Sequence, residues 1–236
     1  TVADLNVEVG RIPNKNQCKM ALQKKIGLKE DESKPLIGLL GRLESQKGIV
    51  LLLKDFSKND ESKLRNLDIQ LLICGRPGDD AAGKHIRQEL KKYAKSFFDW
   101  LRVDMTFVPE KFVHQLFAGC DMILMPSEYE PGGMPQMQGH RYGAIPIVRK
   151  TGGLADTVTD GVDGFVFESG SWGTDEGKMQ SASDSMLEAI TRAVNTYRNN
   201  PKEWGNLIRN AMNRDHTWET SARRYIELYK SARAEH

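Results

Sequence analysis

The sequence predicts an α/β fold in which helices cover both faces of a doubly wound parallel sheet. Short apolar runs alternate with longer stretches of helical periodicity along most of the chain. Strands that are buried on both faces have this continuous apolar pattern, because neither face meets water. The length of 236 residues, with 39% hydrophobic and 28% charged residues, suits one large domain with additional helices.

The expected elements follow the chain in order, and Gly, Pro or Asp bounds most of them. Gly27 ends the first helix, Pro201 suits the first turn of a later one, and Thr217 or Ser221 caps the last. Strands are expected at residues 36–40, 68–74, 101–107, 121–125, 144–148 and 164–167. Helices are expected at residues 15–26, 48–56, 79–98, 112–117, 135–142, 185–198, 201–212 and 218–232.

Three segments are expected along the chain. Residues 1–34 form a linker whose helix bridges from a preceding domain, since the chain begins with Thr1 rather than Met and looks like a piece of a longer protein. Residues 35–168 form the sheet domain. Residues 169–236 begin with a mobile loop rich in Gly, Ser and Asp, which extends to Ser183, and continue with helices that pack on the sheet domain.

Charge, apolar runs and cysteines exclude several classes of function. The net charge of +2 provides no basic field for nucleic acid or an anionic membrane. The longest apolar runs are far shorter than the roughly 20 residues that span a bilayer. Cys18, Cys74 and Cys120 are widely spaced with no CxxC or Cys/His cluster, so we expect no metal site. Cys74 and Cys120 stand in apolar surroundings and are expected to be buried thiols.

The loops that follow the strands carry most of the glycine-rich turns. In a doubly wound sheet, ligands bind beyond the carboxyl ends of the strands. Four of the five loops there are rich in Gly, which lets backbone N–H groups approach a ligand closely. These loops are at residues 41–48, 75–80, 108–110, 126–133 and 149–153. We therefore expect one shared cleft.

Arg42 and Lys47 lie in the first of these loops, beside the start of a helix. Two cations five residues apart at a helix amino end suit a diphosphate, because the side-chain charge and the helix dipole add. The alternative interpretation is a pair of solvated surface cations.

The loop at residues 126–133 combines glycines with two carboxylates. Gly132 and Gly133 stand just before a helix that starts with Pro, which makes a second anion-binding helix end. Glu128 and Glu130 are better suited to accept hydrogen bonds from sugar hydroxyls than to bind phosphate, or else they are capping or surface acids. The third glycine turn, at residues 150–154, is either part of the same cleft or a plain left-handed connection.

Together these segments resemble the starch and glycogen synthases. The resemblance runs from about Leu36 to Phe167, with a weaker match at residues 217–219. It is carried by Gly41-Arg42-Leu43 with Gln46-Lys47-Gly48, by Glu130-Pro131, by residues 149–158, and by the in-register segments 119–121 and 141–143. The family's enzymes have two domains in the GT-B arrangement, and the resemblance implies that this chain is the Rossmann-like C-terminal half that binds the nucleotide-sugar.

The resemblance implies a role for each matching residue. Arg42 and Lys47 would neutralise the nucleotide diphosphate and Glu130 would hold hydroxyls of the donor glucose, so these three are the expected catalytic residues. The expected nucleotide-sugar-binding residues, with Thr151 to Gly153 lining the cleft, are Gly41, Gly75, Gly132, Gly133, Met134, Thr151, Gly152 and Gly153. No metal and no cofactor are expected. His114 either orients its loop or is a buried, satisfied histidine.

Two positions depart from the family's pattern. Many relatives carry Cys where this chain has Gly132, and many related glycosyltransferases carry a second Glu where this chain has Gln138. Bacterial glycogen synthases also lack that second Glu, so the departure favours the synthase branch and leaves recognition of the ribose open.

The implied function is the donor-binding half of a starch or glycogen synthase. Such an enzyme transfers glucose from ADP-glucose to the non-reducing end of an α-1,4-glucan with retention. The glucan would bind through an N-terminal domain that this sequence lacks, so we expect the isolated chain to be inactive. The location would be the plastid stroma, or the cytoplasm in a bacterium. No residue distinguishes ADP from UDP.

Two rival functions were weighed. One is a non-catalytic nucleotide-sugar or glucan-binding regulatory module, which the scattered Trp residues at 100, 172, 204 and 218 do not favour. The other is a related transferase such as sucrose synthase, which the Lys-Thr-Gly-Gly-Leu segment at residues 150–154 argues against.

Overall fold

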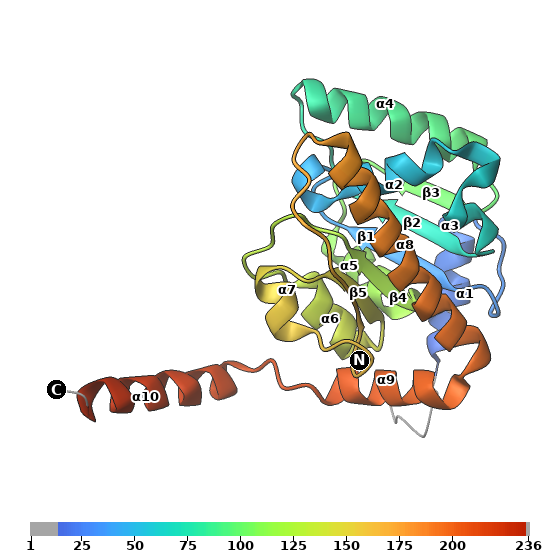
Figure 1. Ribbon diagram of the computed structural model, residues 1–236. Helices are drawn as coiled ribbons and strands as arrows, with labels where there is room; N and C mark the ends of the chain where they lie inside the picture. The colour runs from blue at the N-terminus through green and yellow to red at the C-terminus, as the bar shows by residue number, and fades with distance from the viewer. Residues whose placement is uncertain (1–13, 235–236) are drawn as a thin grey trace.

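The computed structural model describes residues 14–234 and contains in them a six-stranded parallel sheet (Figure 1). The strands lie in the order β3-β2-β1-β4-β5-β6. From β1 the chain builds outward to one edge, then returns to the middle at β4 and builds to the other edge, which confirms the predicted doubly wound α/β fold. The strands are β1 Leu36–Leu40, β2 Gln70–Cys74, β3 Leu101–Asp104, β4 Met122–Met125, β5 Ile145–Arg149 and β6 Phe165–Phe167.

Helices cover both faces of the sheet, and each face has its own apolar cluster. Helices α2, α3, α4, α8 and α9 contribute to one cluster, and α1, α5 and α7 to the other. Side chains along β1 alternate between them, with Ile37 in the first cluster and Leu36 in the second. The helices are α1 Lys15–Lys25, α2 Ile49–Phe56, α3 Lys63–Asn66, α4 Ala81–Ser96, α5 Glu110–Gly119, α6 Pro135–Tyr142, α7 Gly152–Thr157, α8 Glu176–Asn199, α9 Pro201–Asn213 and α10 Trp218–Ala234.

Helix α1 is tied to the sheet by a buried ion pair. Lys19 Nζ lies 2.8 Å from Asp121 Oδ2, and the lysine side chain is fully buried. The same carboxylate oxygen accepts a hydrogen bond from the N–H of Leu36 at 2.8 Å, so one acid joins α1 to two adjacent strands. Residues 14–34 therefore pack with the sheet domain, whereas bridging to a preceding domain stays a prediction. The first 13 residues of the expected linker lie outside the described residues.

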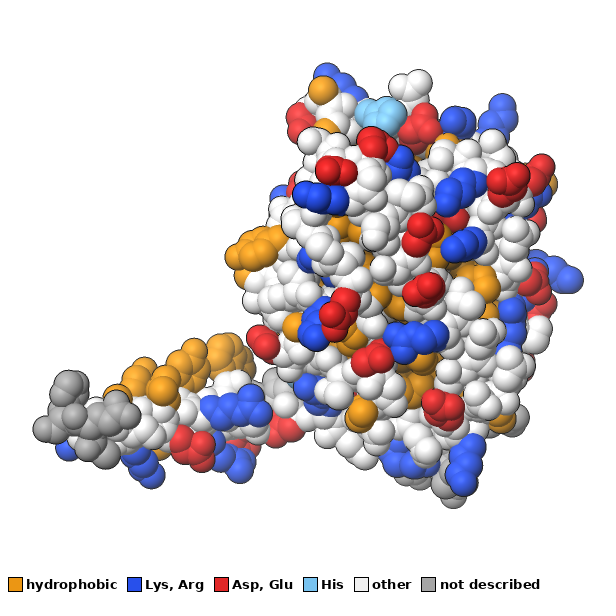
Figure 2. Space-filling model, viewed as in Figure 1, with side chains coloured by type: hydrophobic (Ala, Val, Ile, Leu, Met, Phe, Trp, Pro, Cys, Tyr) orange, Lys and Arg blue, Asp and Glu red, His pale blue; other side chains and the backbone are white. Residues whose placement is uncertain are grey.

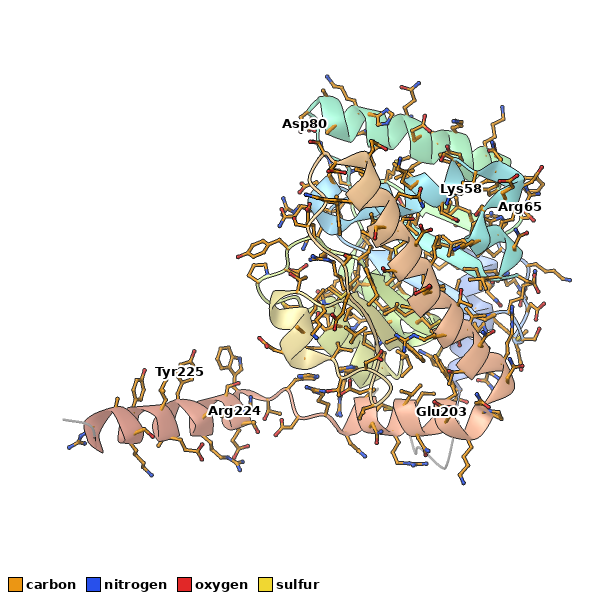
Figure 3. All side chains as sticks on the ribbon, in the orientation of Figure 1. Lys58, Arg65, Asp80, Glu203, Arg224 and Tyr225 are labelled. Atoms are coloured by element: carbon orange, nitrogen blue, oxygen red, sulfur yellow. The ribbon has the colours of Figure 1, made fainter. Side chains whose placement is uncertain are left out.

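Several predicted boundaries were wrong, each for a local reason. Strand β2 starts at Gln70 because Asp68 has a left-handed backbone, with φ of 50°. Strand β3 ends at Asp104, whose carboxylate accepts from the N–H of Thr106 at 2.9 Å and turns the chain. Two short helices were missed, α3 and α7, and α7 occupies the segment expected to be a glycine turn. Helix α4 begins at Ala81, two residues later than predicted, because the carboxylate of Asp80 caps it by accepting from the N–H of Gly83 (Figure 3).

The expected mobile loop to Ser183 was also wrong. Helix α8 begins at Glu176, where the Asp175 carboxylate caps it by accepting from the N–H of Lys178. Ser183 is buried and donates to the carbonyl of Leu51 at 2.9 Å. From Glu176 onward, the polar composition therefore reflects the solvated side of a helix start, whereas residues 169–175 have no regular secondary structure.

Helix α10 does not pack on the sheet domain, which corrects a second expectation for the C-terminal segment. It projects away from the body of the molecule (Figure 1), and apolar side chains form a row along one side of it (Figure 2). Tyr225 points outward from it (Figure 3), and Trp218 is 85% exposed. Within the described residues, no other element therefore covers the apolar side of α10. None of the described helices is long and apolar enough to cross a membrane.

Candidate functional site

A cleft of about 380 Å³ opens at the carboxyl ends of β1 and β4. These strands are adjacent in the sheet although far apart in sequence, so their following loops diverge and leave a crevice at the point where the strand order reverses. The cleft is lined by Leu39, Leu40, Gly41, Arg42, Lys47, Leu124, Met125, Pro126, Ser127, Glu130, Gly133, Met134 and Pro135. Six of the predicted site residues are in this lining.

The loop after β1 places both predicted cations at the cleft. Leu43 is fully buried and anchors the loop, while the side chain of Arg42 is 66% exposed. Gly48 has φ of 76°, and a Cβ there would lie 2.0 Å from the carbonyl oxygen of Pro126. Only glycine therefore lets this loop touch the loop after β4 at that point.

Lys47 and Glu130 form an ion pair across the cleft. Lys47 Nζ lies 2.5 Å from Glu130 Oε2, and the Ser127 hydroxyl donates to the same oxygen at 3.2 Å. Glu130 is 6% exposed and Ser127 is 2% exposed. The sequence predicted both charged residues at the site but not their direct contact. A ligand with a phosphate would compete with Glu130 for the lysine, which would free the carboxylate to accept from hydroxyls.

The start of α6 faces the cleft with its backbone donors available. Its cap residue, Met134, supplies no side-chain hydrogen bond, and Pro135 occupies the first turn. Gln136 is fully buried and donates to the carbonyls of Gly132 and Gly133 at 3.0 and 3.1 Å, which fixes the turn before the helix. A helix amino end without a side-chain cap suits an anion.

The other predicted glycines support the cleft from behind instead of lining it. Gly153 donates its N–H to the carbonyl of Glu130 at 3.0 Å, and a Cβ on Gly152 would lie 2.2 Å from that same oxygen. Thr151 likewise lies behind the loop, with its hydroxyl 3.5 Å from the carbonyl of Glu128. Residues 151–153 are therefore not in the lining of this cleft, where they contact the Glu130 loop instead. Their expected contact with a nucleotide-sugar stays a prediction.

Gly75 also lies outside the lining, next to the loop after β1. A Cβ there would lie 1.7 Å from the carbonyl oxygen of Gly41, so close packing of the two backbones requires glycine at this position. Gly75 therefore contacts the cleft only indirectly, through the backbone of Gly41, which is in the lining.

Glu128 and His114 are not in the lining of the cleft. The Glu128 carboxylate accepts from the N–H groups of Trp172 and Gly173 at 2.7 and 2.8 Å, in the irregular segment before α8. It caps no helix, because the cap of α8 is Asp175. His114 is exposed rather than buried, and its Nδ1 lies 2.6 Å from the Tyr142 hydroxyl.

Ser127, Gln136 and Arg149 were missed as supporting residues. Each is nearly or fully buried, and each holds a loop of the cleft through hydrogen bonds. A polar residue next to a glycine turn at a strand end was the available signal, but such residues are common in loops. Cys74 and Cys120 are buried as predicted, and burial raises the pKa of Cys74 to about 12.

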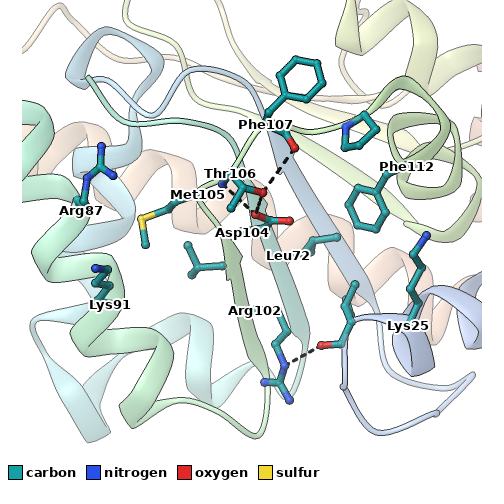
Figure 4. A pocket seen from close by; sticks show the side chains of 13 residues that line it. Lys25, Leu72, Arg87, Lys91, Arg102, Asp104, Met105, Thr106, Phe107 and Phe112 are labelled. Carbon is teal, nitrogen blue, oxygen red and sulfur yellow. Dashed lines mark hydrogen bonds between the residues drawn. The ribbon is translucent and has the colours of Figure 1, made fainter. Parts of the chain in front are cut away.

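A second and larger hollow lies at the edge strand β3, with a volume of about 820 Å³ (Figure 4). Arg87 and Lys91 of α4 lie on one side of it, and Lys25 of α1 and Phe112 of α5 lie on the other. No predicted site residue is in its lining. We refer to this hollow as the β3 groove.

Comparison with known proteins places the chain among glycosyltransferases. It is 37% identical over 228 residues to a glycogen synthase of Thermosipho melanesiensis. That alignment covers 97% of this chain and 44% of the relative. It is 39% identical over 224 residues to a glycogen synthase of Cellvibrio japonicus, with 92% and 42% covered. The chain therefore spans less than half the length of these relatives.

A solved structure agrees with the sequence comparison. The catalytic domain of starch synthase IV from Arabidopsis thaliana, bound to ADP and acarbose, superposes with a TM-score of 0.75 at 30% identity. The match covers 98% of this chain and 44% of that one. The predicted similarity to starch and glycogen synthases and to the GT-B fold is thus confirmed.

The family match extends over most of the chain. The family described as "Glycosyl transferases group 1" matches residues 22–214, which include all strands of the sheet and every loop of the cleft. This chain belongs to the glycosyl transferases group 1.

Proposed function

We propose that this chain is the donor-binding part of a starch or glycogen synthase. In this role it binds ADP-glucose in the cleft between β1 and β4, and the glucosyl group passes to the non-reducing end of an α-1,4-glucan with retention. The observation that carries the proposal is the Lys47–Glu130 pair at the start of α6. It puts a cation for phosphate beside a carboxylate for sugar hydroxyls, at the position where doubly wound sheets bind nucleotides.

The proposed catalytic residues bind different parts of the donor. Arg42 and Lys47 bind the diphosphate, and Glu130 accepts hydrogen bonds from the glucose. Gly133 and Met134 bring the amino end of α6 close to the phosphate or the sugar. Gly75, Gly132 and residues 151–153 hold these loops in place from outside the lining.

In the reaction, the bond between C1 of glucose and the phosphate oxygen breaks, and a bond from C1 to a glucan hydroxyl oxygen forms. The proton of that hydroxyl leaves with the nucleoside diphosphate. Negative charge grows on the phosphate as the sugar departs, and Arg42, Lys47 and the α6 amino end stabilise it. Because these groups are cationic and preorganised, we expect turnover to need no metal and no cofactor.

The rest of the active site is expected on another part of the enzyme. The chain spans about 44% of the length of a glycogen synthase relative. We therefore expect the acceptor to bind on the part of the relatives that this chain does not cover, and the isolated chain to transfer no glucose.

The relatives support an expectation for the nucleotide base of the donor and for the location of the protein in the cell. The starch synthase IV structure contains ADP, which supports ADP-glucose as the donor. The glycogen synthase relatives are bacterial and the starch synthase is from a plant, so the cytoplasm of a bacterium and the plastid stroma are both consistent with them.

The non-catalytic alternative is not favoured. A glucan-binding module needs an exposed aromatic platform, yet Trp100, Trp172 and Trp204 are buried. Trp218, Tyr225 and Tyr229 are exposed on α10, but the aliphatic Ile226 and Leu228 are exposed there as well. A helix with such a mixed apolar surface is typical of one that packs against protein.

Titration calorimetry of this chain with ADP, UDP, ADP-glucose and UDP-glucose tests the proposal. We expect ADP and ADP-glucose to bind, with Lys47→Ala weakening both. Absence of binding by every nucleotide would contradict the donor role. In a separate assay with glycogen and ADP-glucose, measurable elongation by this chain alone would contradict the expectation that the acceptor site is elsewhere.

A further inference from the structure

The segment between β6 and α8 runs beside the loop that carries Glu130. We call residues 169–175 the strap. It has no regular secondary structure, yet Trp172 within it is 2% exposed and lies under the guanidinium of Arg149, 5.3 Å from ring centroid to Cζ. The strap is therefore fastened to the domain rather than loose.

Glu128 supplies one fastening. Its Oε1 accepts three hydrogen bonds from the strap: from the Trp172 N–H at 2.7 Å, from the Gly173 N–H at 2.8 Å, and from the Ser171 hydroxyl. Partial burial opposes the charge, but these donors hold the pKa of Glu128 below its ordinary value, so the carboxylate is ionised at neutral pH. Charge-assisted bonds of this kind are stronger than neutral ones.

Arg149, at the end of β5, supplies the other fastening. Its Nε and Nη2 donate to the Ser169 hydroxyl and carbonyl at 2.9 and 2.7 Å, while Nη1 donates to the carbonyl of Glu128 at 2.6 Å. Arg149 is 6% exposed, so loss of these bonds would leave a buried cation without partners.

The backbone of Glu128 completes the junction. Its N–H donates to the carbonyl of Gln46 at 2.8 Å, in the loop after β1. Glu128 thus joins the loop after β1, the end of β5 and the strap, while Glu130, two residues further on, faces the cleft and Lys47.

We propose that Glu128 and Arg149 are positioning residues for the sugar half of the donor, which they fix by tying the Glu130 loop to the strap. The inference rests on the proposed function. The phosphate-binding cations lie on the loop after β1, whereas Glu130 and Gly133 lie on the tied loop. Loosening the tie therefore weakens recognition of the glucosyl group more than recognition of the diphosphate.

Calorimetry with ADP and ADP-glucose measures this difference. Glu128→Ala is expected to raise the Kd of ADP-glucose at least tenfold and that of ADP less than threefold. Glu128→Gln keeps an oxygen at the Oε1 position and is expected to stay within threefold of the parent chain for both ligands. Glu188→Ala, on the exposed side of α8, is the matched control and should change neither.

A merely structural role predicts a different result. Loss of folded protein lowers the number of binding sites but leaves both dissociation constants unchanged. An unchanged ratio of the two constants in Glu128→Ala would therefore overturn the proposal. Glu128→Asp, which shortens the side chain by one methylene and keeps its charge, is a milder variant that should change the ratio in the same direction.

Hydrogen exchange of the ligand-free chain tests the tie without any donor. Glu128→Ala should accelerate exchange at least tenfold at the N–H groups of Trp172 and Gly173 and at residue 128, and leave β1 and β2 unchanged. Unaltered exchange at residue 128 would refute the link between strap and loop. If the parent chain binds no nucleotide, the proposed function fails, and this exchange result still decides whether the tie exists.

Discussion

The cleft and the β3 groove differ in a way that volume does not reveal. The groove, at about 820 Å³, has roughly twice the volume of the cleft, at about 380 Å³, and both contain cations. The groove, however, lies at the edge strand β3. The cleft lies between the two central strands, β1 and β4, where the order of the strands reverses. Position in the sheet, rather than size, is therefore the reason why we propose the cleft as the donor site.

The cations of the two hollows also have different partners. Arg102 in the groove donates to backbone carbonyls of Ile26, Gly27, Phe98 and Leu101, one of which is drawn in Figure 4. Lys47 in the cleft is paired with a carboxylate that a phosphate can replace. A cation that holds the fold together is not available to a ligand, and a cation with an exchangeable partner is.

The largest expected effect separates the two hollows directly. In an enzyme that also carries the acceptor part, Lys47→Ala or Arg42→Ala should lower glucosyl transfer about 10²–10³-fold, as expected for loss of a group that stabilises transition-state charge. Lys91→Ala, an exposed lysine of the groove, should leave transfer within twofold. Transfer rates from ADP-glucose to glycogen measure both. Near-normal rates in both cleft variants would remove the phosphate-binding assignment.

The next effect tests whether close backbone packing shapes the cleft. Gly152→Ala would force a Cβ to within 2.2 Å of the Glu130 carbonyl at a residue with φ of 41°. We expect a loss of about 1–3 kcal/mol in the free energy of unfolding, together with weaker ADP-glucose binding. Gly177→Ala, at the start of α8, is the control, because the nearest atom to its added Cβ is Asp175 Oδ1 at an ordinary contact distance of 3.4 Å. Urea unfolding and calorimetry give the two quantities, and equal behaviour of the variants would show that the contact is dispensable.

A third test uses pH, because α6 borders the cleft at one end and holds a buried histidine near the other. Burial lowers the pKa of His140 to about 4, with Asp163, His216 and Arg214 as its charged or titratable neighbours. The folded pKa lies below the ordinary value of about 6.5, so the unfolded chain takes up the proton first as pH falls. Stability that is complete above pH 6.5 is then lost between pH 6.5 and 4.

The expected loss is about 1–2 kcal/mol between pH 7 and pH 5, measured by urea unfolding. His140→Gln should show a shallower dependence over this interval, because its side chain does not titrate. Parallel pH dependences for the parent chain and the variant would mean that His140 contributes nothing to it. The described lining of the β3 groove contains no histidine, so this pH effect is assigned to α6 and not to the groove.

The smallest effect on nucleotide binding is expected from the groove itself. Arg102→Met removes the donors to the backbone carbonyls but keeps much of the side-chain volume, so we expect a loss of about 1–2 kcal/mol in the free energy of unfolding. Binding of ADP and ADP-glucose should stay unchanged. A clear loss of nucleotide affinity in this variant would show that the groove and the cleft are coupled, which would break the comparison.

The sequence by itself determined that there are six strands in this order along the described chain, and that the predicted site residues gather at the carboxyl edge of the sheet. Strand β1 was predicted with its observed bounds, since an apolar run between Pro35 and Gly41 is a local signal. Arg42, Lys47 and Glu130 were placed at one cleft because parallel strands present their carboxyl ends at one edge of the sheet. Periodicity and turn residues are local properties of the sequence, so they can be recognised without knowledge of the fold.

Only the tertiary structure decided which way each side chain faces and which glycines are contacted by a neighbour. Glu128 and Glu130 are two residues apart on one loop, yet one binds the strap and the other binds Lys47. The start of α8 and the supporting role of Gly152 likewise depend on residues far away in sequence. Such contacts are set by packing between distant segments, and no local pattern contains that information.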